Sequence, residues 1–290
     1  MEYSVTEKIF YRHYNCLVLS SGGIKGIIQL GILHELIQQN PNILSTVNIY
    51  SGCSVGSIIS CLLSMGFSPL EIFSTSLLVN IGSDVNISQL SKNYGLYDID
   101  AIFSKIEKII IQKYGYIPTL KRLYELTNNI FICNSYNLSK HDIVYFSYQS
   151  HPELSCVDCL KMSCNIPLIF GKIEYQGNLY IDGGFADQLP VKYVDETYPE
   201  NNILCIDIKN KISEIRSIFG YITELAYIPI KIQKKYEKTN VSYVNVSIGD
   251  NILSLSLDKK YKYFLIGKEI FSQGDSVKNK QSRVQKEKIE

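Results

Sequence analysis

A short apolar run and a short β-prone run lie in the first fifty residues, and each is followed by glycines and then by a helical pattern. The first run covers residues 16–20, whose unbroken apolar character is typical of a strand buried on both faces. Three glycines interrupt it, and apolar residues then recur at helical spacing from Ile27 to about Asn40. The second run, residues 47–50, leads through another glycine-rich stretch into a helical pattern over residues 55–65. Two such units in succession predict an α/β protein with a parallel sheet covered by helices.

The rest of the chain alternates between helical and extended patterns. Helical spacing predicts further helices over residues 68–79, 97–115, 119–127, 152–163, 217–238 and 261–272. Extended patterns predict strands over residues 129–133, 143–147, 203–208 and 241–248. Between them, residues 167–184 predict a hairpin that turns at Gly177-Asn178 and whose second strand ends at Ile181.

Composition and length point to one globular domain over residues 1–272, followed by a charged segment, residues 273–290, that we expect to be disordered. The net charge of +1 offers no electrostatic reason to expect nucleic acid as a partner. The start of the chain lacks a signal-peptide pattern, and no apolar run reaches the roughly 20 residues of a spanning helix. The eight cysteines sit mostly in apolar runs, so we expect free thiols and a cytoplasmic protein.

The second glycine stretch carries a candidate nucleophile. Gly52-Cys53-Ser54-Val55-Gly56 matches the G-x-S-x-G elbow, in which a serine occupies a sharp turn between a strand and a helix. Glycines let the neighbouring backbones approach, and the helix N-terminus favours developing negative charge. A tight turn with a helix N-cap explains the same five residues, so the motif alone leaves both interpretations open.

A nucleophilic serine needs a base, and histidine is poorly placed to supply it. The histidines are His13, His34, His141 and His151. His141 or His151, with Asp84, Asp98 or Asp100 as the acid, remains an alternative, although no strand end recommends either histidine. Asp182 follows the predicted strand 179–181 and precedes Gly183 and Gly184, at a carboxyl end where α/β sheets place their sites. An aspartate beside a serine hydroxyl accepts its proton directly.

The first glycine stretch, Ser21-Gly22-Gly23-Ile24-Lys25-Gly26, aims several backbone N–H groups at one point. That arrangement suits an oxyanion or a phosphate. The spacing does not match the phosphate-binding G-x-x-x-x-G-K-[ST] pattern, because Ile27 follows Gly26, and it does not match G-x-G-x-x-G. We therefore expect an oxyanion hole that serves Ser54.

Together these motifs resemble those of the patatin-like phospholipases. Residues 21–26 are similar to the family's G-G-G-x-[RK]-G motif, with Lys25 as the basic residue. Residues 52–56 are similar to its G-x-S-x-G elbow, and residues 182–184 to its D-G-[GA] motif. The stretches MSCNIPLIF (162–170) and FADQLPV (185–191) resemble the family segments S-x-x-x-P-x-x-F and D-N-x-P-V. The resemblance covers about residues 15–190.

This resemblance implies a three-layer α/β/α sandwich and a lipid acyl hydrolase that works through a Ser–Asp dyad. Ser54 would be the nucleophile and Asp182 the general base, and the amides of Gly22, Gly23 and Ile24 would form the oxyanion hole. The supporting motif residues would be Lys25, Gly26, Gly52, Gly56, Gly183 and Gly184. No cofactor or metal is expected, and the partner would be a phospholipid or another acyl lipid at a membrane surface, bound peripherally.

Three positions depart from the family pattern: Ser21, Ser57 and Gln188 replace the usual glycine, a smaller residue and asparagine. These three departures bear on the rate of turnover more than on the identity of the protein. Two other functions therefore stay open, a general esterase or thioesterase on soluble esters and a catalytically silent lipid-binding protein. Cys156-x-x-Cys159, with Cys164 and His151 nearby, raises a zinc or redox alternative, but no second C-x-x-C follows and core packing is favoured. The segment 69–79 fits a lid or an ordinary packed helix.

Overall fold

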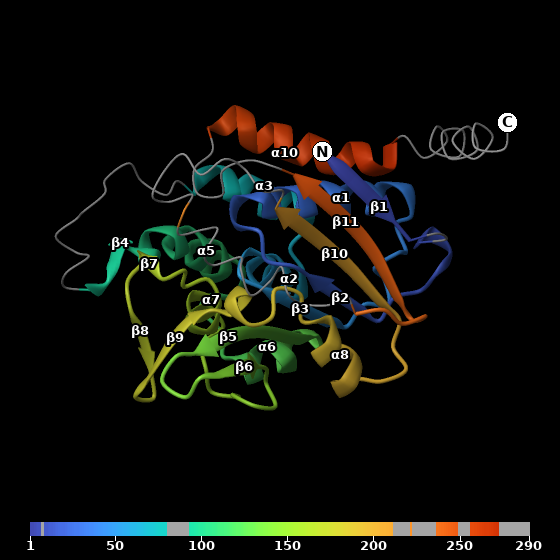
Figure 1. Cartoon of the computed structure of the whole chain (residues 1–290). Coiled ribbons are helices and arrows are strands. Elements are labelled where there is room, and N and C mark those ends of the chain that lie inside the picture. The colour runs from blue at the N-terminus through green and yellow to red at the C-terminus, as the bar shows by residue number, and fades with distance from the viewer. Residues whose placement is uncertain (7–8, 80–92, 211–220, 222–235, 249–255, 273–290) are drawn as a thin grey trace, which may run out of the picture.

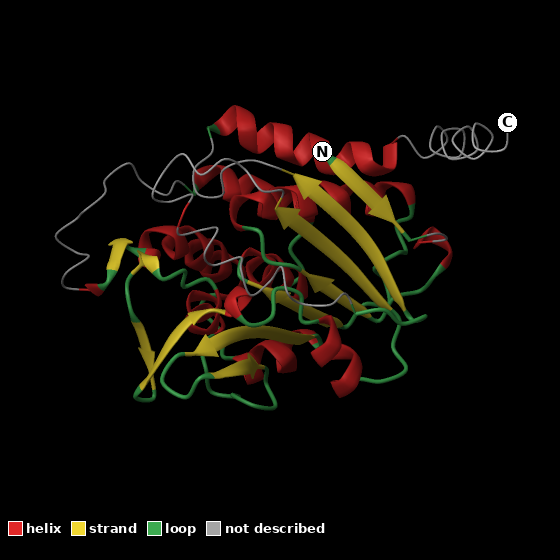
Figure 2. Ribbon diagram, in the orientation of Figure 1, coloured by secondary structure: helices red, strands yellow, loops and turns green. Residues whose placement is uncertain are grey.

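A mixed β-sheet runs through the molecule, with helices packed against it (Figure 1). This computed structural model describes residues 1–6, 9–79, 93–210, 221, 236–248 and 256–272. Most of the helix predicted over residues 217–238 and the charged segment 273–290 lie outside the described residues. Figure 2 shows how strands and helices alternate along the described chain.

The strands of the described chain are three to eight residues long. Their bounds are β1 Glu2–Val5, β2 Cys16–Leu19, β3 Ile49–Cys53, β4 Gly95–Tyr97, β5 Ile130–Asn137, β6 Asp142–Phe146, β7 Leu168–Phe170, β8 Ile173–Tyr175, β9 Asn178–Asp182, β10 Ile203–Asn210 and β11 Val241–Ile248. All residues of β2 and β3 are buried, as the unbroken apolar run predicts for β2 as a central parallel strand.

Among the described residues, the main sheet has the order β1-β11-β10-β2-β3-β5-β9-β8, and β6 pairs with β5. The central strands β11, β10, β2, β3 and β5 are parallel to one another. The strands β1, β6, β8 and β9 add antiparallel pairs at the edges. β4 and β7 form a separate two-stranded parallel sheet. The parallel core confirms the predicted α/β class.

Most helices overlap the predicted ranges, but α8 was not predicted, and α7 and α10 begin four residues away from their predicted starts. Their bounds are α1 Gly26–Gln39, α2 Val55–Ser64, α3 Pro69–Leu78, α5 Ile99–Tyr114, α6 Leu120–Thr127, α7 Cys156–Ser163, α8 Val191–Thr197 and α10 Leu257–Ser272, with the short 3₁₀ helices η1 Ile9–Tyr11, η2 Gly23–Lys25 and η3 Gly183–Phe185. α3 begins with a complete capping box between Ser68 and Glu71. It packs against α1 and α10, as an ordinary packed helix does.

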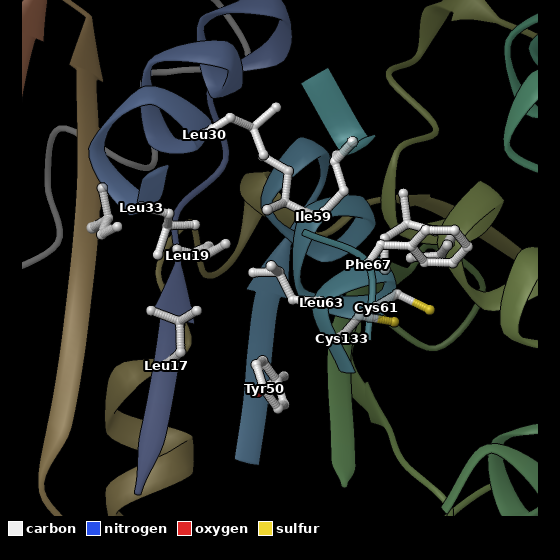
Figure 3. Close-up of a cluster of buried hydrophobic side chains, with 14 of the residues drawn as sticks. Leu17, Leu19, Leu30, Leu33, Tyr50, Ile59, Cys61, Leu63, Phe67 and Cys133 are labelled. Carbon is white, nitrogen blue, oxygen red and sulfur yellow. The ribbon is translucent and has the colours of Figure 1, made fainter. Parts of the chain in front are cut away.

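Alternate side chains of the parallel strands feed two cores on opposite faces of the sheet, because successive strand residues point in opposite directions. Leu17 and Leu19 of β2 enter the larger core, which contains the buried faces of α1, α2, α3, α5, α6, α7 and α10. Figure 3 shows this core where β2, α1 and α2 meet, with Leu19, Leu33 and Leu63 among its members. The smaller core lies under α8 and includes Val18.

α10 crosses α1 at very short range, in the upper part of Figure 1. Gly31 of α1 and Gly267 of α10 face each other, and a Cβ added at either would overlap the backbone of the other helix. The buried ammonium group of Lys260 donates hydrogen bonds to the carbonyls of Ser76 (2.9 Å) and Val79 (2.6 Å) at the end of α3. These contacts fix the last described helix against two others.

Local patterns misplaced several boundaries. β1, which pairs antiparallel with β11, was not predicted, because a four-residue edge strand carries little periodic signal. The run predicted as the first hairpin strand is divided into β7 and β8, and β7 pairs with β4 instead. The hairpin turn lies at Gln176-Gly177, one residue earlier than predicted, where both φ angles are positive (49° and 72°) as a type I′ turn requires.

Candidate active site

Ser54 is the single residue between the end of β3 and the start of α2. Its φ of 53° and ψ of −125° lie outside the regions that a non-glycine residue normally adopts. A Cβ added at Gly52 would overlap the backbone of Gly56, and one added at Gly56 would overlap the carbonyl of Leu19. The start of α2 passes directly over the ends of the strands. The sharp turn is therefore possible only because the two motif glycines have no side chains.

The elbow is held by two other serines. The Ser57 hydroxyl donates to the Ser54 carbonyl oxygen at 2.6 Å, so the departure from the family pattern at this position adds a hydrogen bond inside the turn. The Ser54 N–H donates to the hydroxyl oxygen of Ser163 at 3.0 Å. Because this N–H already has a partner, it does not contribute to an oxyanion hole.

Asp182 is the last residue of β9, one residue beyond the predicted strand end, and it lies at the carboxyl edge of the parallel strands, as predicted. β9 runs antiparallel to β5, a direction that the sequence did not predict, so Asp182 does not reach this edge as the last residue of a parallel strand. Asp182 instead pairs with Ser135 in β5, one residue beyond the Cys53–Asn134 pair that joins β3 to β5. β9 enters from outside that edge and ends level with the elbow.

Ser54 and Asp182 are in direct contact. The Ser54 hydroxyl donates to Oδ2 of Asp182 at 2.6 Å, and the Gly184 N–H donates to Oδ1 at 2.7 Å. Asp182 is only 5% exposed, and this burial raises the pKa of its carboxyl group to about 6 although both hydrogen bonds lower it. The carboxylate is therefore mainly ionised at pH 7 and is basic enough to accept the serine proton.

The turn after Asp182 is fixed by Asn134 of β5. Its side-chain amide donates to the carbonyls of Asp187 (2.8 Å) and Gly183 (3.3 Å). A Cβ added at Gly183 would overlap the Asn134 carbonyl oxygen, so a residue without a side chain is required there. At Gly184 an added Cβ would lie 3.0 Å from Oδ1 of Asp182. The glycine pair thus lets the turn fold over the carboxylate.

The glycine loop, residues 21–26, lies against the two turns that carry Asp182 and Ser54. A Cβ at Gly184 would be 3.4 Å from the Ser21 hydroxyl oxygen, and one at Gly26 would be 2.7 Å from Cγ1 of Val55, next to the nucleophile. Gly23 has a φ of 55°, which favours glycine, and starts η2. Because the first N–H groups of a helix have no partner within it, the amides that open η2 suit an oxyanion.

A network of buried hydrogen bonds holds the glycine loop in place. The Gln29 side-chain amide donates to the Ser20 carbonyl (2.8 Å), and the Ser20 hydroxyl accepts from the Ile208 N–H (2.8 Å). The Ser21 N–H donates to the carbonyl of Gln188 at 3.0 Å, while the Gln188 side chain donates to the Ile208 carbonyl at 3.2 Å. The residue that replaces the family's asparagine therefore connects the loop to β10.

Lys25 does not lie beside the nucleophile. It is 1% exposed, and its ammonium group is 3.4 Å from the carbonyl of Ile248, the last residue of β11. The motif's basic residue therefore connects the loop to β11, which lies two strands away from β2 in the sheet. Ile24, the third expected amide, follows Gly23 in η2 and has a partly buried side chain.

The alternative groups lie elsewhere. His141 occupies the turn between β5 and β6, and His151 packs its ring on Phe146. Neither histidine forms a hydrogen bond with Ser54 or Asp182 in the described part of the chain. Cys156 and Cys159 are core side chains, and the described residues contain no cluster of three or more potential metal ligands.

Sequence reasoning missed the residues that hold this centre together. Ser163 and Asn165 lie in the S-x-x-x-P-x-x-F segment, which was a usable signal, whereas Asn134 and Gln29 sit in ordinary element patterns. Their roles follow from contacts between segments far apart in the chain, which no local pattern records.

The fold agrees with comparisons to known proteins. The chain belongs to the patatin-like phospholipase family, whose model matches residues 17–195. "Probable lipid hydrolase 463L" of Invertebrate iridescent virus 6 is 30% identical over 260 residues, which cover 86% of this chain and 84% of the relative. "Uncharacterized protein R571" of Acanthamoeba polyphaga mimivirus is 27% identical over 289 residues, covering 91% and 94% of the two chains.

A solved structure shows the same fold. VipD from Legionella pneumophila superposes with a TM-score of 0.57 at 17% identity, covering 93% of this chain and 69% of the VipD chain. The family assignment and this superposition confirm the predicted α/β fold with a mostly parallel central sheet flanked by helices. Within the described residues, every helix is too short or too polar to span a bilayer.

Proposed function

We propose that this protein is a lipid acyl hydrolase of the phospholipase A type, with Ser54 as nucleophile and Asp182 as general base. The observation that carries the proposal is the buried 2.6 Å hydrogen bond from the Ser54 hydroxyl to the Asp182 carboxylate. The strained elbow presents the hydroxyl, and burial raises the pKa of Asp182 to about 6, near the working range of a general base.

In the proposed reaction, Asp182 takes the proton of Ser54 while the serine oxygen attacks the acyl carbonyl of a phospholipid ester. The amides of Gly22, Gly23 and Ile24 stabilise the oxyanion of the tetrahedral intermediate. The lysophospholipid alkoxide leaves with the proton from Asp182. Water then attacks the acyl-enzyme and gives its proton to Asp182, which returns it to Ser54 as the fatty acid departs. The residues of the chain suffice for this reaction without a cofactor.

The proposed substrate sits at a membrane surface, where the protein binds peripherally from the cytoplasm. We also propose that residues 1–272 act as one acyl hydrolase domain. Two alternatives are separated by experiment. A general esterase or thioesterase would hydrolyse monomeric and micellar esters of the same chain length equally well, whereas a lipid acyl hydrolase prefers the micellar form. A silent lipid-binding protein would not react with a fluorophosphonate at Ser54.

The test is mass spectrometry of phosphatidylcholine vesicles after incubation with purified protein. Wild type should release fatty acid and lysophospholipid, and Ser54→Ala and Asp182→Asn should each lower the rate at least about thousandfold. Ser64→Ala is the matched control, because this buried serine of α2 donates only to Cys61 within its own helix. Near-normal rates in Ser54→Ala or Asp182→Asn would overturn the proposal.

A further inference from the structure

The two residues of the dyad come from strands that are not neighbours. Ser54 follows β3, Asp182 ends β9, and β5 lies between these strands in the sheet. Two inter-strand steps separate β3 from β9, which corresponds to about 9.6 Å between their backbones. The sheet alone therefore does not set a 2.6 Å distance between the side chains, and other contacts must locate both backbones.

One short segment, residues 163–165 at the end of α7, contacts both backbones. The Ser163 hydroxyl oxygen accepts a hydrogen bond from the Ser54 N–H at 3.0 Å. The carbonyl oxygen of Asn165 accepts one from the Asp182 N–H at 2.8 Å. The side-chain amide of Asn165 also donates to the carbonyl of Tyr180, two residues earlier in β9, at 2.8 Å. We call residues 163–165 the bridging segment.

These contacts are shielded from water. Ser163 is fully buried and Asn165 is 2% exposed, so a lost hydrogen bond would leave a buried backbone group without a partner. Oδ1 of Asn165 makes no hydrogen bond among the described residues, so the amide NH₂ group is the part of this side chain that bonds to the protein. The buried hydroxyl of Ser135 reinforces the same seam, lying 3.1 Å from the Met162 carbonyl and 2.7 Å from the Ile181 carbonyl.

We propose that Ser163 and Asn165 are positioning residues that set the distance between the Ser54 hydroxyl and the Asp182 carboxylate. The proposal rests on the proposed function, because it assigns these residues to that reaction. Neither side chain contacts the reacting atoms. Ser163 acts through the backbone of the nucleophile, and Asn165 acts through the backbone of the strand that carries the base.

The pH dependence of the reaction reports this role. The hydrogen bond from Ser54 lowers the pKa of Asp182, so a longer distance between them raises that pKa and moves the acid limb of kcat/KM to higher pH. Among the described residues, the other titratable groups near this centre are the thiols of Cys53 on β3 and Cys164 in the bridging segment, and the carboxyl group of Asp187, which acts on Cys53. Burial raises the pKa of both thiols well above the usual range, so they stay uncharged across the acid limb.

The test compares Ser163→Ala, Asn165→Ala and the double variant with wild type, using a soluble monomeric ester. Rates are expressed per native protein, with the native fraction measured by circular dichroism. Each single variant should lower kcat by about tenfold to a hundredfold with KM changed less than about twofold, because misplacement affects the chemical step. Both should move the acid limb upward. The kcat of the double variant should be little lower than that of the less active single variant, since both changes act on one distance.

Two control variants remove similar groups without touching the bridging segment. Ser64→Ala deletes a buried serine hydroxyl that, among the described residues, bonds only within α2. Asn137→Ala deletes a 2% exposed asparagine that also contacts Tyr180, but through the tyrosine hydroxyl at 3.3 Å and not through the strand backbone. Both controls should lower stability at most, with kcat per native protein and the acid limb unchanged.

Unchanged kcat and an unmoved acid limb in Ser163→Ala and Asn165→Ala would overturn the positioning role while leaving the proposed function intact. A wild-type protein that releases no fatty acid and is not labelled at Ser54 by a fluorophosphonate would instead overturn the proposed function, and this inference with it. The rate of fluorophosphonate labelling gives an independent measurement, and it should fall in step with kcat in both variants.

Discussion

At the scale of single residues, the ionised form of Asp182, which the proposed reaction needs, makes the native state less stable. Burial raises the pKa of its carboxyl group from 3.8 to about 6, because the charged form loses solvation inside the protein. The unfolded chain binds this proton less tightly than the folded chain does. The contribution of Asp182 to stability is therefore greatest at low pH and falls as the pH rises from about 4 to about 6.

Asp182→Asn should consequently raise the free energy of unfolding at pH 8 while abolishing activity. The pKa difference of about 2 units corresponds to about 3 kcal/mol, and we expect a gain of about 1–2 kcal/mol because the amide replaces one of the two acceptors with a donor. Urea unfolding at pH 8 and at pH 4 measures the effect, and the gain should disappear at pH 4. Glu153→Gln, at an exposed position, controls for the charge change. A variant less stable than wild type at pH 8 would contradict this account.

At the scale of elements, the crossing of α10 over α1 depends on two glycines that have no other evident role. Glycine in a helix interior is unfavourable by about 1 kcal/mol relative to alanine, so its presence at Gly31 and Gly267 needs a compensating contact. The close backbone approach provides it, because it buries Phe264 and Phe271 of α10 in the larger core.

Gly267→Ala should therefore lower the free energy of unfolding by about 1–3 kcal/mol, although alanine is the better helix former. The added methyl overlaps the carbonyl of Ile28 and forces the helices apart. Chemical denaturation followed by circular dichroism measures the change. Ser74→Ala on the exposed face of α3 is the control and should change stability by less than about 0.5 kcal/mol. If Gly267→Ala proved as stable as wild type, α10 would have to pack less closely than described.

At the scale of the whole molecule, the cysteines are part of the two hydrophobic cores. All eight are free and buried, and they are distributed over central strands and over helices on the larger core. Burial raises the thiol pKa at seven positions, so little reactive thiolate forms there at neutral pH: Cys16 (to about 12), Cys53, Cys61, Cys133, Cys159, Cys164 and Cys205. Thiol reactivity therefore reports global opening of the fold.

Titration with a disulfide reagent at pH 8 should show slow reaction of the native protein and eight reactive thiols once it is unfolded in guanidinium chloride. Fewer than eight thiols after unfolding, without reductant, would reveal a disulfide and contradict the buried free thiols described here. Rapid labelling of any cysteine in the native protein would show that its part of the core opens readily. Protein reduced beforehand provides the reference count.

Local sequence determined the elements and the residues that carry chemistry. Apolar runs and helical spacing are set by which side chains must be buried, so they predicted β2, α1, α2 and β11 within about two residues. Ser54 and Asp182 were named because their glycine-rich flanks leave a local signature of tight turns and close backbone approach. The family resemblance rested on the same flanks.

Tertiary structure alone decided how those residues meet. The antiparallel direction of β9 and its register on β5 depend on hydrogen bonds between strands about 45 residues apart, which leave no pattern within either strand. The bridging segment contacts the backbone N–H groups of Ser54 and Asp182 through the Ser163 hydroxyl and the Asn165 carbonyl oxygen, and only the folded chain shows that these distant groups pair. Residue identity predicts chemistry, whereas the distance between two distant residues is a property of packing.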